Sequence, residues 1–298
     1  MVRQYKIHTN LDGTDDKVWD VTNGKVRFYQ PSNLGLQSTN NIWQSNGIGV
    51  MGTRSITQPQ IEFKLETFGE SLEENYRLMK DFINDILNQK FVTLEYQTEI
   101  FQVYADLALA DVTKTEGYGK NGTFSEKITF DIITKWYTYE NLTFDMVQNG
   151  KVISGKSKIY GGTAPGYYKY VKGTSYTYYG ETNIERLSRW DIKDEIFSFM
   201  GILYPQLPKT PAGVRFLDDI GNEYTAIVFK TEQVQDYILI NTDVNDETYQ
   251  GWKGTTALNL FPVMDFERYR TRIIKKGQME LINLSKAEFK IKRKADFV

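Results

Sequence analysis

The sequence predicts a mainly β protein with two domains and one long helix. Segments of alternating apolar and polar residues recur along the chain, separated by Asn-Gly and other turn residues. Only residues 71–89 show the spacing of apolar residues that is typical of a helix. A length of 298 residues is long for one core, so we expect domains over residues 1–136 and 137–298. The second half has no comparable helix pattern, which favours an antiparallel β-sandwich.

The predicted helix, residues 71–89, has a well-marked start. Ser71 and Glu74 have the spacing of a capping box, in which both side chains accept backbone N–H groups of the first turn. Alternating segments precede it (QIEFKLETF) and follow it (FVTLEYQ), and they predict the sheet on which it packs. One helix face is apolar and should be buried; its residues are Leu72, Tyr76, Met79, Phe82, Ile83, Ile86 and Leu87.

The rest of the first domain is predicted as strands in a sandwich-like arrangement. A strand RQYKIH opens it, and KVWDV and KVRFY then flank Asn23-Gly24, which predicts a hairpin with a tight type I′ turn. A second long hairpin is expected across Asn121-Gly122, and the domain should end near Trp136.

Residues 30–58 interrupt this pattern and are rich in Gly, Asn, Ser and Gln. Uninterrupted loops of this length are usually functional or disordered. Disorder is one interpretation, but the segment carries more apolar side chains than a solvated linker does. We therefore favour an arm, residues 30–56, that becomes ordered against a neighbouring copy of the chain. Its candidate contact residues are Leu34, Leu36, Ile42, Trp43, Ile48, Val50 and Met51.

The second domain is predicted to begin with a hairpin around Asn149-Gly150. Further strands are expected around GVRFL, YTAIVF, DYILIN, RTRIIKKG, QMELIN and AEFKIKR. The segment from Lys151 to Gly180 has no acidic residue and is rich in Tyr, Gly, Ser, Thr and Lys, as adaptable recognition loops are. Ordinary Tyr-rich strands and a platform for single-stranded nucleic acid are the alternatives. The candidate partner-binding residues are Tyr160, Tyr167, Tyr168, Tyr170, Tyr176, Tyr178 and Tyr179.

Composition narrows the possible functions. A formal net charge of -2 gives no general case for binding nucleic acid or an anionic membrane. The absence of cysteine excludes disulfides, thiolate nucleophiles and Cys-based metal sites. The N-terminal residues lack the apolar core of a signal peptide, and no apolar run approaches the roughly 20 residues that span a bilayer. We expect a soluble protein made in a cytoplasm, with no cofactor.

Three motifs resemble catalytic or ligand sites but have simpler explanations. GIGVMG matches G-x-G-x-x-G, yet the sequence around it predicts neither the strand nor the helix of a dinucleotide site. His8 is the only histidine, so a triad or a His-based metal site is disfavoured. Acidic clusters could bind calcium or hydrolyse glycosides, but their neighbours favour solvated turns. These clusters are Asp12, Asp15 and Asp16; Asp218, Asp219 and Glu223; and Asp243, Asp246 and Glu247.

The order of these parts resembles the distal tail proteins of siphophages, in particular the lactococcal phage form, over nearly the whole chain. The resemblance rests on the succession of KVWDV, the polar arm, the capped helix, KWYTY and a closing LFPVMDF, KKGQMEL, AEFKIKR series. It implies a hexameric ring that N-terminal domains build and through which DNA passes without specific binding. It also implies an arm that embraces the next subunit and a galectin-like C-terminal domain whose extension, residues 151–180, holds receptor-binding protein.

Three classes of function compete on this basis. The first is a structural, non-enzymatic hub in the virion that joins the tail tube protein to the tail tip protein. The second is a carbohydrate-binding sandwich that contacts host cell-wall glycan. The galectin sugar motif is absent, and Trp252 could stack on a sugar but has no matching polar constellation in the sequence. The third is a carboxylate glycosidase. We expect the first.

Overall fold

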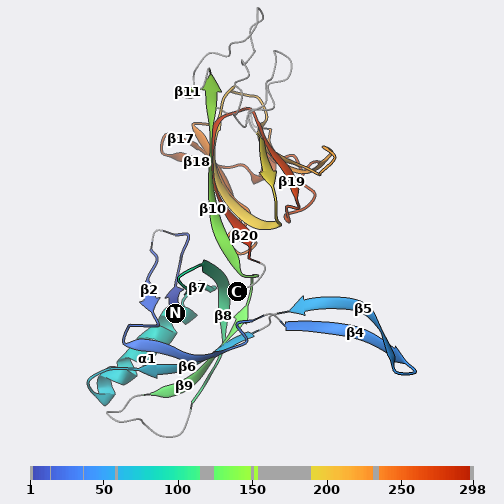
Figure 1. Ribbon diagram of the computed structural model, residues 1–298. Coiled ribbons are helices and arrows are strands. Elements are labelled where there is room, and N and C mark those ends of the chain that lie inside the picture. Colours follow the sequence, from blue (N-terminus) through green and yellow to red (C-terminus); the bar gives the residue numbers. More distant parts are fainter. Residues whose placement is uncertain are drawn as a thin grey trace, which may run out of the picture. The chain divides into compact units, whose positions relative to one another are not determined.

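The computed structural model describes residues 3–13, 15–35, 37–57, 60–114, 124–148, 151–153, 189–230 and 235–295. The chain divides into two compact units (Figure 1). Unit 1 contains Met1–Thr138 and Ala295–Val298, and unit 2 contains Tyr139–Lys294. The chain therefore returns to unit 1 after unit 2: the amide of Ala295 donates to the carbonyl of Trp136 at 2.8 Å.

Unit 1 is built on one antiparallel sheet in the order β2-β1-β7-β8-β9-β6-β3. The strands are β1 (Gln4–His8), β2 (Val18–Asp20), β3 (Val26–Ser32), β6 (Gln60–Thr67), β7 (Val92–Gln97), β8 (Gln102–Thr113) and β9 (Ser125–Ile132). Alternation along β6 buries Ile61, Phe63 and Leu65, as the sequence predicts. The predicted pairing across Asn121-Gly122 is also confirmed, because β8 pairs with β9.

Helix α1 (Leu72–Leu87) packs on this sheet (Figure 1). The Oγ atom of Ser71 accepts the Glu74 amide at 3.2 Å, and the Glu74 carboxylate accepts the Glu70 amide at 2.7 Å. Phe82 is fully buried and makes edge contacts with Trp19 and Phe28. Phe82 and Ile86 are the buried residues of the predicted apolar face.

Three residues of the predicted apolar face are exposed, contrary to expectation: Leu72 (50%), Tyr76 (60%) and Leu87 (62%). The buried residues Asn75, Phe82 and Ile86 share one side of the helix, because they are seven and four residues apart. Tyr76 and Leu87 each follow a buried residue directly and so lie to one side of this stripe, and Leu72 is the first residue of the helix. Asn75 is buried instead, since its side chain accepts the Gly69 amide at 2.6 Å and donates to the Ser71 carbonyl at 3.0 Å.

The predicted hairpin around Asn23-Gly24 is wrong. β2 pairs with β1, and β3 pairs with β6. Neither Asn23 nor Gly24 has the positive φ of a type I′ turn. The Asp20 carboxylate instead accepts the amides of Thr22 and Asn23, at 3.0 and 2.9 Å. This side chain creates a wider turn that directs β3 to the opposite edge of the sheet.

Unit 2 is a sandwich of two antiparallel sheets that enclose one core. One sheet has the order β18-β17-β16-β13-β20-β10, with β11 paired to β10, and the other has the order β12-β19-β14-β15. The first sheet contains β10 (Tyr137–Gln148), β11 (Lys151–Ile153), β13 (Ile196–Pro205), β16 (Tyr237–Asn241), β17 (Thr248–Lys253), β18 (Thr256–Asn259) and β20 (Leu284–Lys294). The second contains β12 (Arg189–Ile192), β14 (Ala212–Leu217), β15 (Glu223–Phe229) and β19 (Gly277–Ile282).

The core of unit 2 contains Phe199, Ile240 and Phe289 from the first sheet and Phe216 and Ile227 from the second. The β10–β11 pairing confirms the predicted hairpin around Asn149-Gly150. RTRIIKKG does not form the predicted strand: Ile274 makes an isolated bridge to Ile196, and only the final residue, Gly277, belongs to a strand, β19. A short 3₁₀ helix, η2 (Phe261–Val263), was not expected from the sequence.

Candidate interaction surface

The predicted arm is a β-hairpin of β4 (Gln37–Ser45) and β5 (Ile48–Thr57), the two blue strands so labelled in Figure 1. In the part of the chain that the structure describes, the two strands pair only with one another. The register joins Trp43 to Val50 and Ser45 to Ile48. Farther from the turn that joins the strands, a hydrogen bond of 2.9 Å runs from Arg54 Nε to Asn40 Oδ1.

The turn of this hairpin is Asn46-Gly47, with φ values of 52° and 79°. Asn-Gly is the preferred dipeptide where both central residues need positive φ. The dipeptide is thus a turn signal inside the segment for which the sequence predicted an arm without strands. The same geometry explains GIGVMG, because Gly47 is in the turn and Gly49 and Gly52 are in β5, with no helix after them.

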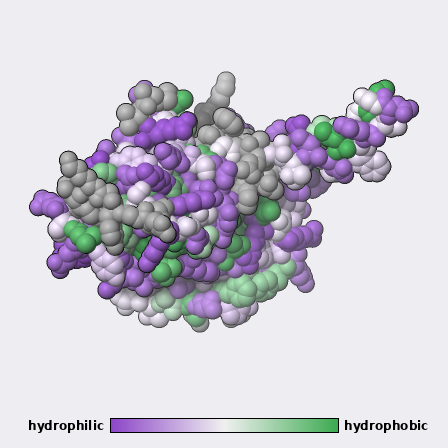
Figure 2. Space-filling model, turned by 90° about the horizontal axis from the view of Figure 1, so that it is seen from below, coloured by the Kyte–Doolittle hydropathy of each residue, from purple (hydrophilic) through white to green (hydrophobic). Residues whose placement is uncertain are grey.

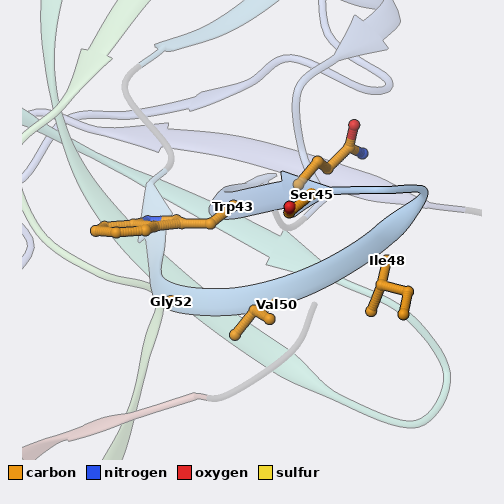
Figure 3. A pocket seen from close by; sticks show the side chains of 6 residues that line it. Trp43, Ser45, Ile48, Val50 and Gly52 are labelled. Atoms are coloured by element: carbon orange, nitrogen blue, oxygen red, sulfur yellow. The ribbon is translucent and has the colours of Figure 1, made fainter.

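One face of the hairpin gathers apolar side chains. Cross-strand partners share a face, so Trp43, Ile48 and Val50 lie together, and Ile42 and Met51 lie on the other face. In Figure 3, Ile48 and Val50 point to the same side of β5 and the Trp43 ring lies beside Gly52. These residues line an open hollow of about 610 Å³.

The apolar side chains of the hairpin are unusually exposed. The exposed fractions are 71% for Trp43, 70% for Ile48 and 65% for Val50. Figure 2 shows hydrophobic residues among hydrophilic ones on the surface of the hairpin, the projection at the right of the view. A two-stranded hairpin is at best marginally stable in water. A well-formed hairpin with a large exposed aromatic side chain is therefore expected to be covered by a partner.

Two other predicted arm residues are not part of this surface. Leu34 is half-buried and packs against the core of unit 1. Leu36 lies outside the described residues.

The Tyr-rich segment lies largely outside the described residues. Only 151–153 of it are described, in β11, and none of the seven candidate tyrosines is included. Their role as a partner-binding surface stays a prediction.

The acidic clusters lie in turns and ion pairs. Asp218 Oδ1 accepts the amides of Ile220 and Asn222, and the carboxylate of Glu223 forms a paired contact with Arg268 at 2.8 and 2.6 Å. Asp243 pairs with Lys292. Within the described ranges, no group of three or more His, Cys, Asp or Glu side chains could hold a metal ion.

His8 has a more elaborate environment than the sequence suggested. Its Nδ1 lies 2.6 Å from Asp16 Oδ2 and its Nε2 lies 2.9 Å from Glu95 Oε2. Lys6 Nζ also donates to Glu95, at 2.9 Å. Burial alone would raise the pKa of Glu95, but the hydrogen bonds from Lys6 and His8 hold that pKa below its ordinary value. His8 and Glu95 are buried within unit 1, Lys6 and Asp16 are partly exposed, and the cluster has the character of a structural polar network.

Among the helices that the structure describes, none is long and apolar enough to cross a membrane.

Comparison with known proteins places the whole chain in one family. Residues 4–133 match the model of the distal tail protein N-terminal domain, and residues 135–298 match that of the Dit C-terminal domain. The distal tail proteins of Lactococcus phages p2 and SK1 are 95% and 92% identical, each over 100% of both chains. A chain from the structure of the phage P2 baseplate in its activated conformation with Ca is 95% identical, with full coverage of both chains and a TM-score of 0.80.

A more distant structure confirms the fold. The SPP1 Dit protein (gp 19.1) is 13% identical, with a TM-score of 0.53 and coverage of 98% of this chain and 99% of that one. The two family models together span nearly all of the sequence. This chain therefore belongs to the distal tail protein family of phages.

Proposed function

We propose that this protein is a structural component of a siphophage baseplate in the virion, and that copies of it form a ring, a hexamer in the form that the resemblance implies. Membership of the distal tail protein family and the 95% identity to a chain of the phage P2 baseplate support the baseplate role. In this role the ring joins the tail tube protein to the tail tip protein, and DNA passes through it without specific contacts.

The observation that supports the ring is the exposed apolar face of the β4–β5 hairpin. Full burial of an apolar side chain stabilises by about 1.5–3 kcal/mol, so covering Trp43, Ile48 and Val50, each about two-thirds exposed, gives roughly 3–6 kcal/mol per arm. A contact between a hairpin and a different surface of the next copy is heterologous. Heterologous contacts close into rings when the rotation between neighbours permits.

The C-terminal unit would carry the receptor-binding proteins. Its sandwich of two antiparallel sheets supports the galectin-like domain that the resemblance implies, and the Tyr-rich composition of residues 151–180 suits adaptable contacts with such a partner.

The mass in solution, measured by size-exclusion chromatography with light scattering, tests the arm. We expect the unmodified chain to form a multiple of its 34.6 kDa mass and a Trp43→Ser, Val50→Ser variant to be a monomer. Ser55→Thr is the matched control, since Ser55 is an exposed residue of the same hairpin that pairs with Thr39, and neither residue lines the hollow. An assembly that survives the double substitution would refute the proposal.

A further inference from the structure

The outer face of the larger sheet of unit 2 carries a row of aromatic side chains. Burial alternates along β17, where Tyr249 and Gly251 are buried and Gln250 and Trp252 are partly exposed, so the latter two face solvent. Tyr237 of β16 is the cross-strand partner of Trp252, and their rings stack at 6.1 Å with an interplanar angle of 12°. Tyr204 of β13 continues the row, with its ring 6.4 Å from that of Tyr237.

Among the residues that the structure describes, Tyr237 is the aromatic neighbour that stacks on the Trp252 indole, and it covers one ring face. Tyr237 lies on one side of it, and on the other side the cross-strand partner is Ala257 of the edge strand β18. Ala257 is exposed and carries only a methyl group. Side chains stand roughly perpendicular to a sheet, so this small residue leaves room beside the indole for a flat, apolar ligand surface.

Polar side chains occupy the adjacent row of the same face. Two residues before Trp252, about 7 Å along the strand, Gln250 lies opposite Asn259. On the other flank, Ile202 and Leu239 are paired and Glu288 lies opposite Ile202. The Oδ1 atom of Asn259 accepts the Phe261 amide at 3.0 Å, so the NH2 group is the part of this side chain that can donate to a ligand. The face thus presents amides and a carboxylate beside aromatic rings.

A groove of about 330 Å³ continues this face on the β10 side. Its lining combines apolar Met200, Ile202 and Leu239 with Asn141, Glu288 and Lys290. The volume lies at the lower end of the range for small-molecule sites. Glu288 forms an ion pair with Lys286, so the charges nearby are of mixed sign and do not favour a highly charged polymer.

We propose that this face of unit 2 binds a neutral saccharide, with one pyranose ring stacked on the open side of Trp252 and its hydroxyls bonded to Gln250 and Asn259. A sugar ring has an apolar C–H face and an equatorial belt of hydroxyls, which match an aromatic ring flanked by planar amides. Further sugar units would pass along the ring edges of Tyr237 and Tyr204 toward the groove. The faces of these rings are occupied, because Tyr237 lies between Trp252 and Tyr204, and Lys286 Nζ lies 5.4 Å from the centre of the Tyr204 ring. This site is separate from the arm and does not depend on the proposed ring.

Saturation-transfer NMR of the full chain with chitotetraose, cellotetraose and maltotetraose tests this proposal, at about 10 mM saccharide to detect millimolar affinity. We expect at least one saccharide to bind. The Ala257→Phe variant fills the space beside the indole, and Gln250→Ala removes one amide; each should weaken binding about tenfold or more. Ala257 is exposed, so the larger side chain is compatible with folding, which circular dichroism checks.

Tyr76→Ala is the matched control, because Tyr76 is a 60% exposed aromatic residue of unit 1 and its replacement should leave saccharide binding unchanged. The proposal is overturned if none of the three saccharides binds, or if Ala257→Phe binds as tightly as the unmodified chain. A lower assembly mass for Ala257→Phe, without saccharide binding, would also overturn it and assign the face to a second copy of the chain.

Discussion

The buried ion pair between Lys292 and Asp243 is expected to stabilise unit 2, and substitution of either residue tests this expectation. Lys292 Nζ lies 2.9 Å from Asp243 Oδ2, and the two side chains are only 6% and 8% exposed. The second oxygen of Asp243 accepts the Asn245 amide at 3.0 Å, so the carboxylate also fixes the turn after β16. Replacing Lys292 by Met keeps much of the buried stem but leaves the carboxylate without its cation.

Breaking a buried pair in this way is expected to reduce the free energy of unfolding by about 3–5 kcal/mol, because the remaining charge stays desolvated. Asp243→Asn should also destabilise unit 2, since it removes the carboxylate charge that pairs with the Lys292 ammonium group. Combining both substitutions leaves no net charge in the site, so the double variant should lose much less than the sum, with a coupling energy of about 2 kcal/mol or more.

Urea unfolding, followed by hydrogen exchange in peptides from β13, β16 and β20, reports on unit 2 separately from unit 1. Lys286→Met is the matched control in the same strand, because the Lys286–Glu288 pair is 39% and 38% exposed and should contribute no more than about 1 kcal/mol. Equal losses for the two Lys→Met variants, or additive effects in the double variant, would refute the reasoning.

Four further outcomes are expected. Phe82→Ala removes a fully buried ring and should destabilise unit 1 by about 3–5 kcal/mol in urea unfolding, whereas the exposed Tyr76→Ala should change it little; equal effects would contradict the described core. Gly47→Val, at φ 79°, should strain the turn by about 1–2 kcal/mol and speed hydrogen exchange across residues 37–57; unchanged exchange would argue against the turn. The pKa of Glu95 is held below its ordinary value of 4.5, so its contribution to stability is complete above that pH and is lost as pH falls through the folded-state pKa. Glu95→Gln should accordingly flatten the acid limb of a stability profile, and an unaltered limb would exclude this role. Deletion of residues 151–180 should leave the number of subunits in the assembly unchanged but abolish co-purification with receptor-binding protein; retained binding would exclude that segment as the binding site.

Local sequence signals predicted the elements of this fold better than their partners. The Ser71 cap and the alternation around Phe63 each depend on neighbours within a few residues, and both are present in the structure. The Asn23-Gly24 prediction failed because the Asp20 carboxylate accepts the amides of Thr22 and Asn23, and the strand that follows pairs with β6 and not with β2. Pairing between distant strands is decided by the whole sheet, which a dipeptide does not encode.

For the candidate surfaces, too, the sequence predicted individual residues better than their arrangement. The apolar residues of the arm were visible in the sequence, but the hairpin that sorts Trp43 and Met51 onto opposite faces depends on the Asn46-Gly47 turn, which was not predicted. Trp252 was visible too, whereas its neighbours Gln250 and Asn259 come from two paired strands. Only the register shows that Asn259 lies opposite Gln250 on the same face as the ring.

The return of the chain to unit 1 at Ala295 has a consequence for synthesis. A ribosome delivers the chain from the N-terminus, and domains generally fold as they emerge. The hydrogen bond from Ala295 to Trp136 cannot form until every residue of unit 2 has been made. The final contact within unit 1 is thus delayed until the sandwich sequence is complete, so a prematurely terminated chain lacks it.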